Sequence, residues 1–312
     1  MKTKIAIVGT GGVGGFIGGL LARFYESSDE VSVYFISRGK ALESIRKNGI
    51  EIEADCGHFF ARPAAATDDS TQIGTMDYVL FCTKAYDVKG GITQIMPCIG
   101  PDTVIIPFLN GVDSVETIRG MLPGNQVWYG CVYVVAYILT PGHIKESTNG
   151  YRYYFGHPDA DKEKVRILAE IFSRAGICAR ASENIEIRVW DKFAFISTVA
   201  TVTSYTDKTY GEILSEPEYR SMLMNLLAEF KAVAAAENKP LSEDITHAVV
   251  AQMEKIPPQT TTSMQRDFRA GRNTELESLT GYIVRKAKEN GLTVSTYEVM
   301  YKTLSEKNIS TK

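Results

Sequence analysis

The sequence has few of the residues that build metal centres or disulfide frameworks. Its five cysteines are odd in number, widely spaced and without a C-x-x-C pair, which indicates reduced thiols. The four histidines are too scattered along the chain to form a metal-ligand pair, so we expect no zinc site. A net charge of −3 includes no basic excess. We therefore expect binding neither to nucleic acid nor to a membrane surface.

One uncharged stretch, residues 5–22, resembles a signal peptide or a membrane helix. Lys2 and Lys4 precede it, and small residues recur in it at four-residue spacing. The stretch contains seven glycines, however, so its helix propensity is poor and its hydrophobicity modest. No other segment of the sequence looks membrane-like. We reject the membrane interpretation and expect a cytoplasmic protein.

The same stretch carries the dinucleotide fingerprint G-x-G-x-x-G. A short apolar strand is predicted over residues 5–8, and a helix is predicted over residues 12–24. Gly9 permits the tight turn, Gly11 lets the backbone approach a pyrophosphate, and Gly14 lets the helix pack on the strand. We expect the whole turn to bind the cofactor, through Gly9, Thr10, Gly11, Gly12, Val13 and Gly14.

The end of the second predicted strand, residues 31–36, indicates which cofactor is bound. NAD enzymes usually have an acidic residue there, whereas an arginine accommodates the 2′-phosphate of NADP. Here the strand is followed by Ser37, Arg38, Gly39 and Lys40. We therefore predict NADPH, with Arg38 on the phosphate, Ser37 as a hydrogen-bond donor and Lys40 as a second charge. The alternative is that Arg38 is a solvated loop residue.

Strand and helix signals alternate as far as residue 181 and then give way to helical periodicity. Strands are predicted twice within 49–63, at 76–82 and 103–108, within 126–156 and at 176–181, with a helix at 161–175. Further on, a helical apolar stripe and a helix over 275–290 capped by Gly291 are predicted. We predict an α/β fold, with a doubly wound, mostly parallel Rossmann-type domain over 1–183 and an all-helical domain over 184–312.

Five separated blocks resemble the ketopantoate reductase (2-dehydropantoate 2-reductase) family, within the 6-phosphogluconate dehydrogenase-like superfamily. The resemblance covers nearly the whole chain and implies NADPH-dependent reduction of a branched 2-oxo acid to the 2-hydroxy acid, a step toward pantothenate and coenzyme A. The blocks are the glycine fingerprint, Thr83-Lys84-Ala85, Asn110-Gly111, Trp190-Asp191-Lys192, and the run from Thr262 to Glu275 that contains Ser263, Met264, Asp267, Gly271, Arg272 and Thr274.

The resemblance also implies roles for single residues. Lys192 matches the catalytic lysine, and Asn110 matches the asparagine that contacts substrate and cofactor. Ser263 matches the serine that binds the substrate carboxylate, and Glu275 matches the glutamate that binds substrate hydroxyl groups. The role of Asp267 is left open.

Two of these residues have independent support from the predicted strands. Lys84, which matches a lysine near the cofactor, and Asn110 each follow a predicted strand. Ligands of open α/β sheets bind at the carboxyl ends of the strands, so both residues are expected at that edge.

Lys192 suits the chemistry of ketone reduction, because a positioned ammonium can stabilise the developing oxyanion and donate the proton. Its neighbours Trp190, Phe193 and Phe195 are expected to desolvate it and lower its pKa. On spacing alone, a lysine whose stem packs on these aromatic rings is the alternative.

The sequence departs from the family at two positions. Asparagines commonly lie four and eight residues after the catalytic lysine, where this chain has Ile196 and Ala200. The expected partner is a small 2-oxo acid, most simply ketopantoate. Alternatives are another branched 2-oxo acid, or a catalytically silent protein that senses NADP. The sequence does not decide the oligomeric state, and a homodimer is one option.

Overall fold

The computed structural model describes residues 2–148 and 150–310 of the chain. The chain folds into two compact units. The first unit is Met1–Leu109 with Ser114–Ile185, and the second is Asn110–Asp113 with Glu186–Lys312. The loop 110–113 therefore belongs to the second unit, although it follows a strand of the first.

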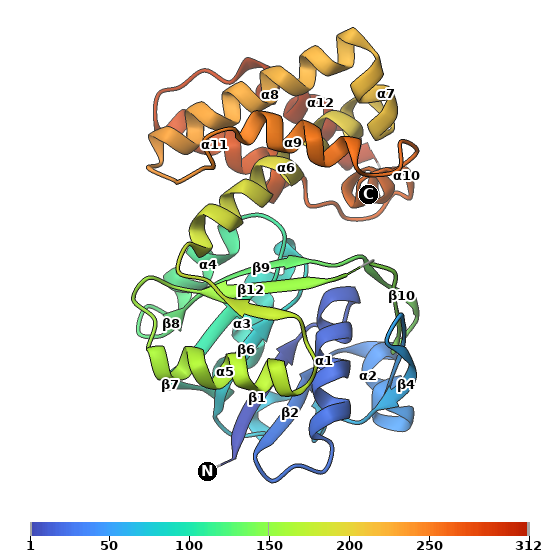
Figure 1. Cartoon of the computed structure of the whole chain (residues 1–312), viewed down its shortest axis with the longest axis vertical. Coiled ribbons are helices and arrows are strands. Elements are labelled where there is room, and N and C mark those ends of the chain that lie inside the picture. Colours follow the sequence, from blue (N-terminus) through green and yellow to red (C-terminus); the bar gives the residue numbers. More distant parts are fainter. Residues whose placement is uncertain (1, 149, 311–312) are drawn as a thin grey trace. The chain divides into compact units, whose positions relative to one another are not determined.

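The first unit is organised around a six-stranded sheet (Figure 1). Every neighbouring pair in it is parallel, as the sequence predicts. Six sequential strands in the order 3-2-1-4-5-6 form a doubly wound Rossmann-type sheet, which confirms the predicted fold class. In spatial order the strands are β5 (Ala65–Thr67), β2 (Val31–Ile36), β1 (Thr3–Val8), β6 (Met76–Phe81), β7 (Ile99–Pro107) and β8 (Gln126–Val127).

Helix α1 (Gly12–Tyr25) packs between this sheet and a second, four-stranded sheet. A Cβ atom on Gly18 would lie 2.8 Å from Phe35 of β2, and one on Gly19 would lie 2.7 Å from Ile52 of β3. The glycines that suggest a membrane helix therefore allow a helix to contact two sheets at once. The second sheet has the order β10 (Ala136–Thr140), β11 (His143–Glu146), β3 (Ile50–Ala54) and β4 (Gly57–Ala61).

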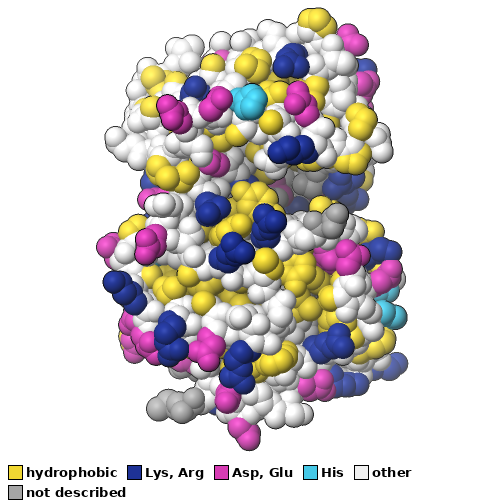
Figure 2. Space-filling view, viewed as in Figure 1, with side chains coloured by type: hydrophobic (Ala, Val, Ile, Leu, Met, Phe, Trp, Pro, Cys, Tyr) yellow, Lys and Arg dark blue, Asp and Glu magenta, His cyan; other side chains and the backbone are white. Residues whose placement is uncertain are grey.

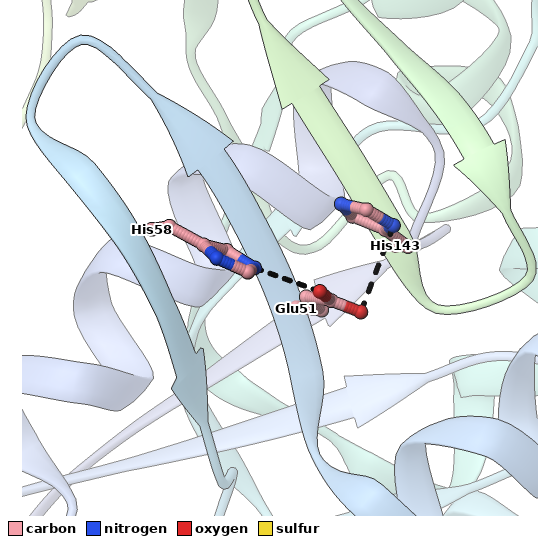
Figure 3. Close-up of side chains that lie close together, drawn as sticks. All are labelled: Glu51, His58 and His143. Atoms are coloured by element: carbon pink, nitrogen blue, oxygen red, sulfur yellow. Dashed lines mark hydrogen bonds and ion pairs between the residues drawn. The ribbon is translucent and has the colours of Figure 1, made fainter.

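The second sheet buries one face against α1 and carries polar side chains on the other. Ile50, Ile52 and Ile144 are fully buried. Glu51, His58 and His143 come together from strands β3, β4 and β11 (Figure 3). Because β11 is far from β3 and β4 in sequence, the spacing of the histidines alone does not indicate this cluster.

A third sheet and further helices complete the first unit. The sheet has the order β13 (Ala179–Ala181), β12 (Arg152–Gly156) and β9 (Tyr129–Tyr133). The last strand is shorter than the predicted 176–181, because Gly176 lies at φ +69° in the turn that ends the preceding helix. The helices are α2 (Gly39–Asn48), α3 (Val88–Ile95), α4 (Asp113–Met121) and α5 (Lys162–Arg174).

Two further boundaries differ from the prediction. Strand β7 begins at Ile99 rather than at residue 103. Helix α2 begins directly after Arg38, within the polar run that follows the second predicted strand. Gly39 lies at φ +56°, so the chain turns sharply into that helix.

The second unit is helical, as predicted. Its helices are α6 (Ile185–Thr206), α7 (Tyr210–Ser215), α8 (Pro217–Ala236), α9 (Ile245–Glu254), α10 (Ser263–Arg269), α11 (Tyr282–Glu289) and α12 (Ser295–Ser310). The predicted apolar stripe of α8, from Leu223 to Ala234, is buried along its length. The helix predicted over 275–290 begins instead with a π-helical turn, Glu277–Gly281.

Charged side chains of both signs lie on the surface (Figure 2). On the face seen in Figure 2, acidic and basic side chains lie among neutral and apolar ones, and a group of basic side chains lies close together near the middle of the view. Within the described parts of the chain, no helix is both long and apolar enough to cross a membrane.

Candidate functional site

The glycine turn has the geometry that its sequence predicts. Gly9 lies at φ +89°, a conformation that side chains disfavour, and its N–H donates to the carbonyl of Ile36 at 3.0 Å. A Cβ on Gly14 would lie 2.0 Å from the carbonyl oxygen of Gly9. A Cβ on Gly12 would lie 2.0 Å from the carbonyl oxygen of Ala136. Packing alone therefore accounts for Gly12 and Gly14.

Gly11 is different, because packing does not explain it. No described atom lies within 4 Å of the position that a Cβ would take there. Gly11 is also the N-cap of α1 and, having no side chain, leaves the first turn without a side-chain cap. Backbone N–H groups at such a helix start can bind a phosphate. The turn therefore fits the pyrophosphate of a dinucleotide.

Thr10 and Ser37 connect the glycine turn to the end of β2. Their hydroxyl oxygens are 2.6 Å apart, and both residues are buried. If Thr10 donates this hydrogen bond, the hydroxyl proton of Ser37 is available to an acceptor outside the pair. The Ser37 N–H donates to the carbonyl of Thr67 and holds the residue in place.

Arg38 and Lys84 lie at the carboxyl edge of the parallel sheet. Arg38 is the N-cap residue of α2, and its exposed guanidinium is 4.0 Å from the carboxylate of Asp87. Lys84 is partly buried and precedes the short 3-10 turn Ala85–Asp87 that follows β6. Arg38 follows β2 and Lys84 follows β6, and these two strands lie on either side of β1. The glycine turn comes directly after β1.

In the second unit, Lys192 lies on α6 and contacts Asn110. The Lys192 ammonium donates a hydrogen bond to Asn110 Oδ1, with an Nζ–Oδ1 distance of 3.2 Å. Lys192 is only partly buried. Two residues that are 82 positions apart in sequence therefore meet.

Two of the aromatic neighbours of Lys192 pack into the helical core. Trp190 and Phe193 pack edge-on against each other, Phe193 packs edge-on against Tyr282, and Trp190 is tilted against Phe230. On a helix, residues one or two apart do not share a face. These two rings therefore belong to the core, and the desolvation of Lys192 by its aromatic neighbours stays a prediction.

The loop that carries Asn110 is held against the π-helical turn. Ser278 Oγ donates to Asp113 Oδ2 at 2.7 Å, and Gly111, at φ +84°, approaches the Ser278 backbone closely. The π-turn is in turn bound to α6, where Ser197 Oγ donates to the Leu279 carbonyl at 2.7 Å. Single π-turns inside helices frequently occur at functional sites. The sequence did not predict this turn. Its only sign in the sequence is two hydroxyl residues of α6, Ser197 and Thr201, which hydrogen-bond to it.

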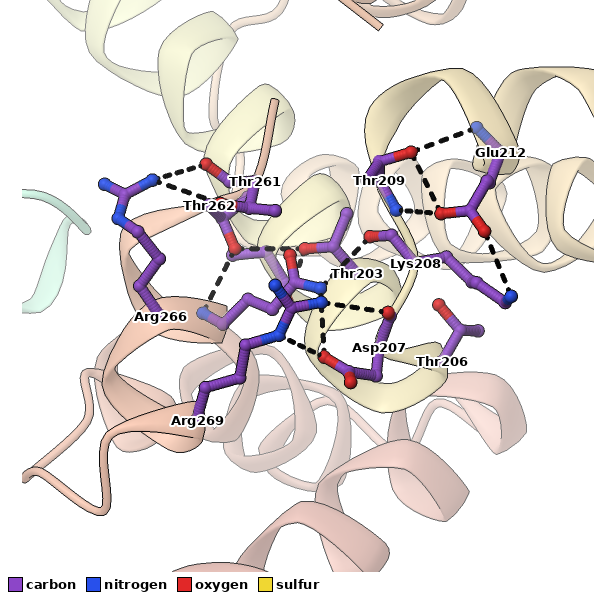
Figure 4. A network of polar contacts seen from close by, with 12 residues as sticks. Thr203, Thr206, Asp207, Lys208, Thr209, Glu212, Thr261, Thr262, Arg266 and Arg269 are labelled. Atoms are coloured by element: carbon purple, nitrogen blue, oxygen red, sulfur yellow. Dashed lines mark hydrogen bonds and ion pairs between the residues drawn. The ribbon is translucent and has the colours of Figure 1, made fainter. Parts of the chain in front are cut away.

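A polar network joins the far end of α6 to the start of α10, where Ser263 lies directly after Thr262 (Figure 4). Ser263 is the first residue of α10, whose N-cap Thr262 lies 3.0 Å, oxygen to oxygen, from Thr203 of α6. Arg269 Nε donates to Asp207 Oδ1 at 2.7 Å and ties the other end of α10 to the end of α6.

One side of α6 therefore connects Lys192 to Ser263. Positions 192, 196 and 203 lie within about 40° of one another around a helix with 3.6 residues per turn. Lys192 and Ile196 are partly buried, whereas Ala200 and Thr203 are buried. The rise from Lys192 to Thr203 is about 16 Å. A molecule bound along this side would contact Lys192 near one end and α10 at the other.

Glu275 and Asp267 differ in their surroundings. Glu275 is buried at 4% exposure, two residues before the π-helical turn. Asp267 forms a paired contact with Arg272, whose Nε and Nη2 lie 2.9 and 2.7 Å from Asp267 Oδ1. Asp267 is therefore engaged in a local ion pair that closes the loop after α10.

Comparisons with known proteins agree with this arrangement. Residues 5–160 match the family model "Ketopantoate reductase PanE/ApbA", and residues 184–308 match its C-terminal companion. The chain is 30% identical over 302 residues to the uncharacterized oxidoreductase YkpB of Bacillus subtilis, covering 96% of this chain and 97% of that protein.

Solved structures agree as well. The 2-dehydropantoate 2-reductase of Porphyromonas gingivalis is 36% identical, with a TM-score of 0.85, over 98% of this chain and 100% of that one. The enzyme from Methylococcus capsulatus is 29% identical, with a TM-score of 0.88, over 99% of this chain and 98% of that one. Two family models that together span most of the chain, and a fold shared over its length, lead to one conclusion. The chain belongs to the ketopantoate reductase family of oxidoreductases.

Proposed function

We propose that this protein reduces ketopantoate (2-dehydropantoate) to pantoate with NADPH, a cytoplasmic step toward pantothenate and coenzyme A. The observation that carries the proposal is the contact between Lys192 Nζ and Asn110 Oδ1 at 3.2 Å. It brings an ammonium and an amide together in a family whose chemistry needs both. In this proposal residues 1–183 bind the cofactor and residues 184–312 bind the substrate.

Residues of the first unit would hold the cofactor. NADPH supplies the hydride. The turn from Gly9 to Gly14 receives the pyrophosphate, because Gly11 leaves space there and α1 begins without a side-chain cap. Ser37 and Arg38 bind the 2′-phosphate, and Lys84 lies beside the cofactor. When NADPH binds, Arg38 gives up its weak contact with Asp87 and forms a charge-assisted hydrogen bond to the 2′-phosphate.

Lys192 acts as the general acid. When the ketone accepts a hydride, negative charge develops on its oxygen, and a nearby ammonium stabilises that charge and donates a proton. Asn110 accepts a hydrogen bond from Lys192 and so aims the ammonium. The hydroxyls of α6 and the π-turn that hold the Asn110 loop keep this geometry rigid.

The substrate is proposed to extend from Lys192 along α6. Ser263, at the start of α10, binds its carboxylate, and the buried Glu275 accepts a hydrogen bond from its hydroxyl group. Thr203 and Thr262 would support Ser263 through their 3.0 Å contact.

A second candidate substrate is favoured by Ile196 and Ala200. Both lie on α6 beyond Lys192, and neither offers a hydrogen bond to the terminal hydroxyl of ketopantoate. An apolar pocket distinguishes two molecules that differ by one hydroxyl by only about 10²-fold. We therefore include 2-oxoisovalerate, the deoxy analogue of ketopantoate, as an alternative substrate.

The test is the oxidation of NADPH, followed by absorbance, with each of the two acids. We expect turnover of both, with a ratio of kcat/KM below about 10²-fold. Ile196→Asn should shift the preference toward ketopantoate, and Ile196→Leu is the matched apolar control. Turnover of neither acid contradicts the proposed activity. A wild-type preference for ketopantoate above about 10⁴-fold instead means that other groups pair its hydroxyl.

A further inference from the structure

Strands β3, β4 and β11 place two imidazoles and a carboxylate on one face of the second sheet. Glu51 lies directly opposite His143 in the parallel pairing of β3 with β11. His58 lies opposite Glu53 in the antiparallel pairing of β3 with β4. Glu51 and Glu53 are two residues apart on one strand, so they project from the same face. The register therefore brings the three side chains Glu51, His58 and His143 together.

The three side chains point toward one another rather than outward (Figure 3). His58 Nε2 is 2.7 Å from Glu51 Oε1, and His143 Nδ1 is 3.6 Å from Glu51 Oε2. One ligand atom from each residue lies within 4.8 Å of the other two, and this is the one such group of three in the part of the chain that the structure describes. Donors bound tetrahedrally at about 2.1 Å lie near 3.4 Å from one another, so these ligand atoms already lie close to the spacing that a metal ion needs. His58 has 58% of its side chain exposed.

A second carboxylate, that of Glu53, lies near the other ring nitrogen of His143. Its Nε2 lies 3.8 Å from Glu53 Oε2, on the other side of the ring from Glu51. Metal-bound histidines usually direct their second nitrogen toward a carboxylate or carbonyl in this way. Glu53 is itself held by Lys145, whose Nζ lies 2.6 Å from Glu53 Oε1. The inner carboxylate, Glu51, faces the two imidazoles.

The scaffold beneath these residues is rigid. The opposite face of β3 and β11 carries Ile50, Ile52 and Ile144, which are fully buried against α1. Histidine side chains are visible at the molecular surface on the side of the first unit where β4 and β10 lie (Figure 2). The group is thus open to solvent while its backbone is fixed, which favours a preorganised set of ligands.

We propose that Glu51, His58 and His143 form a binding site for a divalent transition-metal ion, with water completing its coordination. Two imidazoles and one carboxylate suit Zn²⁺, Co²⁺ or Ni²⁺, and not the hard ions Mg²⁺ or Ca²⁺, which prefer oxygen ligands alone. A bound ion would join three strands of the second sheet. The metal site is independent of the reductase activity, because no residue proposed to bind the cofactor or the substrate belongs to it.

Titration of ZnCl₂ into the full-length protein, free of any histidine tag, tests the proposal by calorimetry. We expect one equivalent to bind in the wild type, with no heat from MgCl₂. His58→Ala and Glu51→Gln should each weaken Zn²⁺ binding by more than about tenfold. Both positions are at least partly exposed, so both variants should fold, and His143→Ala is the third test. With Co²⁺, the wild type should show visible absorption bands that these variants lack.

Two matched variants control for other ligands. His247→Ala removes an exposed histidine of the second unit that lies 3.9 Å from Asp244. Cys56→Ser removes the exposed thiol in the turn between β3 and β4. Both should bind Zn²⁺ like the wild type. The proposal is overturned if the wild type binds no Zn²⁺, if Mg²⁺ binds equally, if His58→Ala and Glu51→Gln bind normally, or if Cys56→Ser abolishes binding.

Discussion

The guanidinium of Arg38 is exposed, and its acidic neighbour is Asp87 at 4.0 Å. An exposed pair of this kind contributes little, so a 2′-phosphate can displace it. Loss of a charge-assisted hydrogen bond costs about 1.5 to 3 kcal/mol, and Arg38→Ala should therefore raise the KM for NADPH by about 10- to 150-fold. The KM for NADH should hardly change. Steady-state kinetics measure this, with Lys47→Ala at an exposed position of α2 as the control. Equal use of both cofactors by the wild type contradicts the prediction.

Lys192 is the residue on which the proposed chemistry depends. Lys192→Ala should lower kcat by about 10²- to 10⁴-fold, because the general acid is lost. Affinity for NADPH, measured by fluorescence titration, should stay close to that of the wild type. The control is Lys231→Ala, which removes an exposed lysine of α8. A near-normal kcat would instead assign Lys192 a packing role and leave the proton donor elsewhere.

At the scale of elements, α1 depends on glycine because it packs between two sheets. A Cβ on Gly19 would lie 2.7 Å from Ile52 in the buried centre of the second sheet. Gly19→Ala should therefore destabilise the protein by about 1 to 3 kcal/mol, as overpacked cores do. Gly120→Ala is the matched control, since no described atom lies within 4 Å of its Cβ position in α4. Urea denaturation compares the two, and equal stability of both variants would contradict this role of the α1 glycines.

Helix α7 begins with a capping box whose stability depends on pH. The Thr209 N–H donates to the carboxylate of Glu212, and this bond, with help from Lys208, lowers the pKa of Glu212 from 4.5 to about 2. A lowered pKa means that the folded state favours the ionised form. The stabilisation is therefore complete above pH 4.5 and is lost as the pH falls toward 2.

Glu212→Gln tests this pH dependence. The difference in unfolding free energy between the wild type and Glu212→Gln should be constant above about pH 5 and should shrink as the pH falls to about 3, because the unfolded state gains the proton first. Chemical denaturation at several pH values measures it, and Glu254→Gln provides an exposed control on α9. A difference that does not change over this range would mean that the carboxylate charge contributes nothing at this cap.

At the scale of the whole molecule, the two tryptophans report on the two units separately. Trp128 lies in the first unit and Trp190 in the second, and each is 1% exposed. Trp190→Phe leaves Trp128 as the only tryptophan, and Trp128→Phe leaves Trp190. Thermal unfolding followed by fluorescence then shows the transition of each unit.

NADPH should raise the unfolding temperature that Trp128 reports. A ligand at about 100 times its Kd stabilises the state that binds it by about 2.7 kcal/mol. The glycine turn, Ser37 and Arg38 all belong to the first unit. The unfolding temperature reported by Trp128 should therefore rise at least as much as the one reported by Trp190. A shift reported by Trp190 alone would place the main cofactor contacts outside the first unit.

Local sequence determined much of this protein. The run Ile5–Gly14 specifies a strand, a turn and a helix, because Gly9 must adopt a positive φ and Gly14 must let the helix approach the strand. Alternating strands and helices were enough to predict a parallel sheet, and periodicity was enough to predict the buried stripe of α8. These features depend on neighbours within a few residues, which a sequence displays directly.

The remaining features were decided by tertiary structure alone, because they depend on contacts between segments that are distant in sequence. The glycines of α1 look like a membrane pattern until two sheets are seen to contact them. Trp190 and Phe193 lie beside Lys192 in sequence but pack into the helical core, since adjacent helical residues face different ways. His58 and His143 are 85 positions apart and meet through strand register, which only the folded sheet establishes.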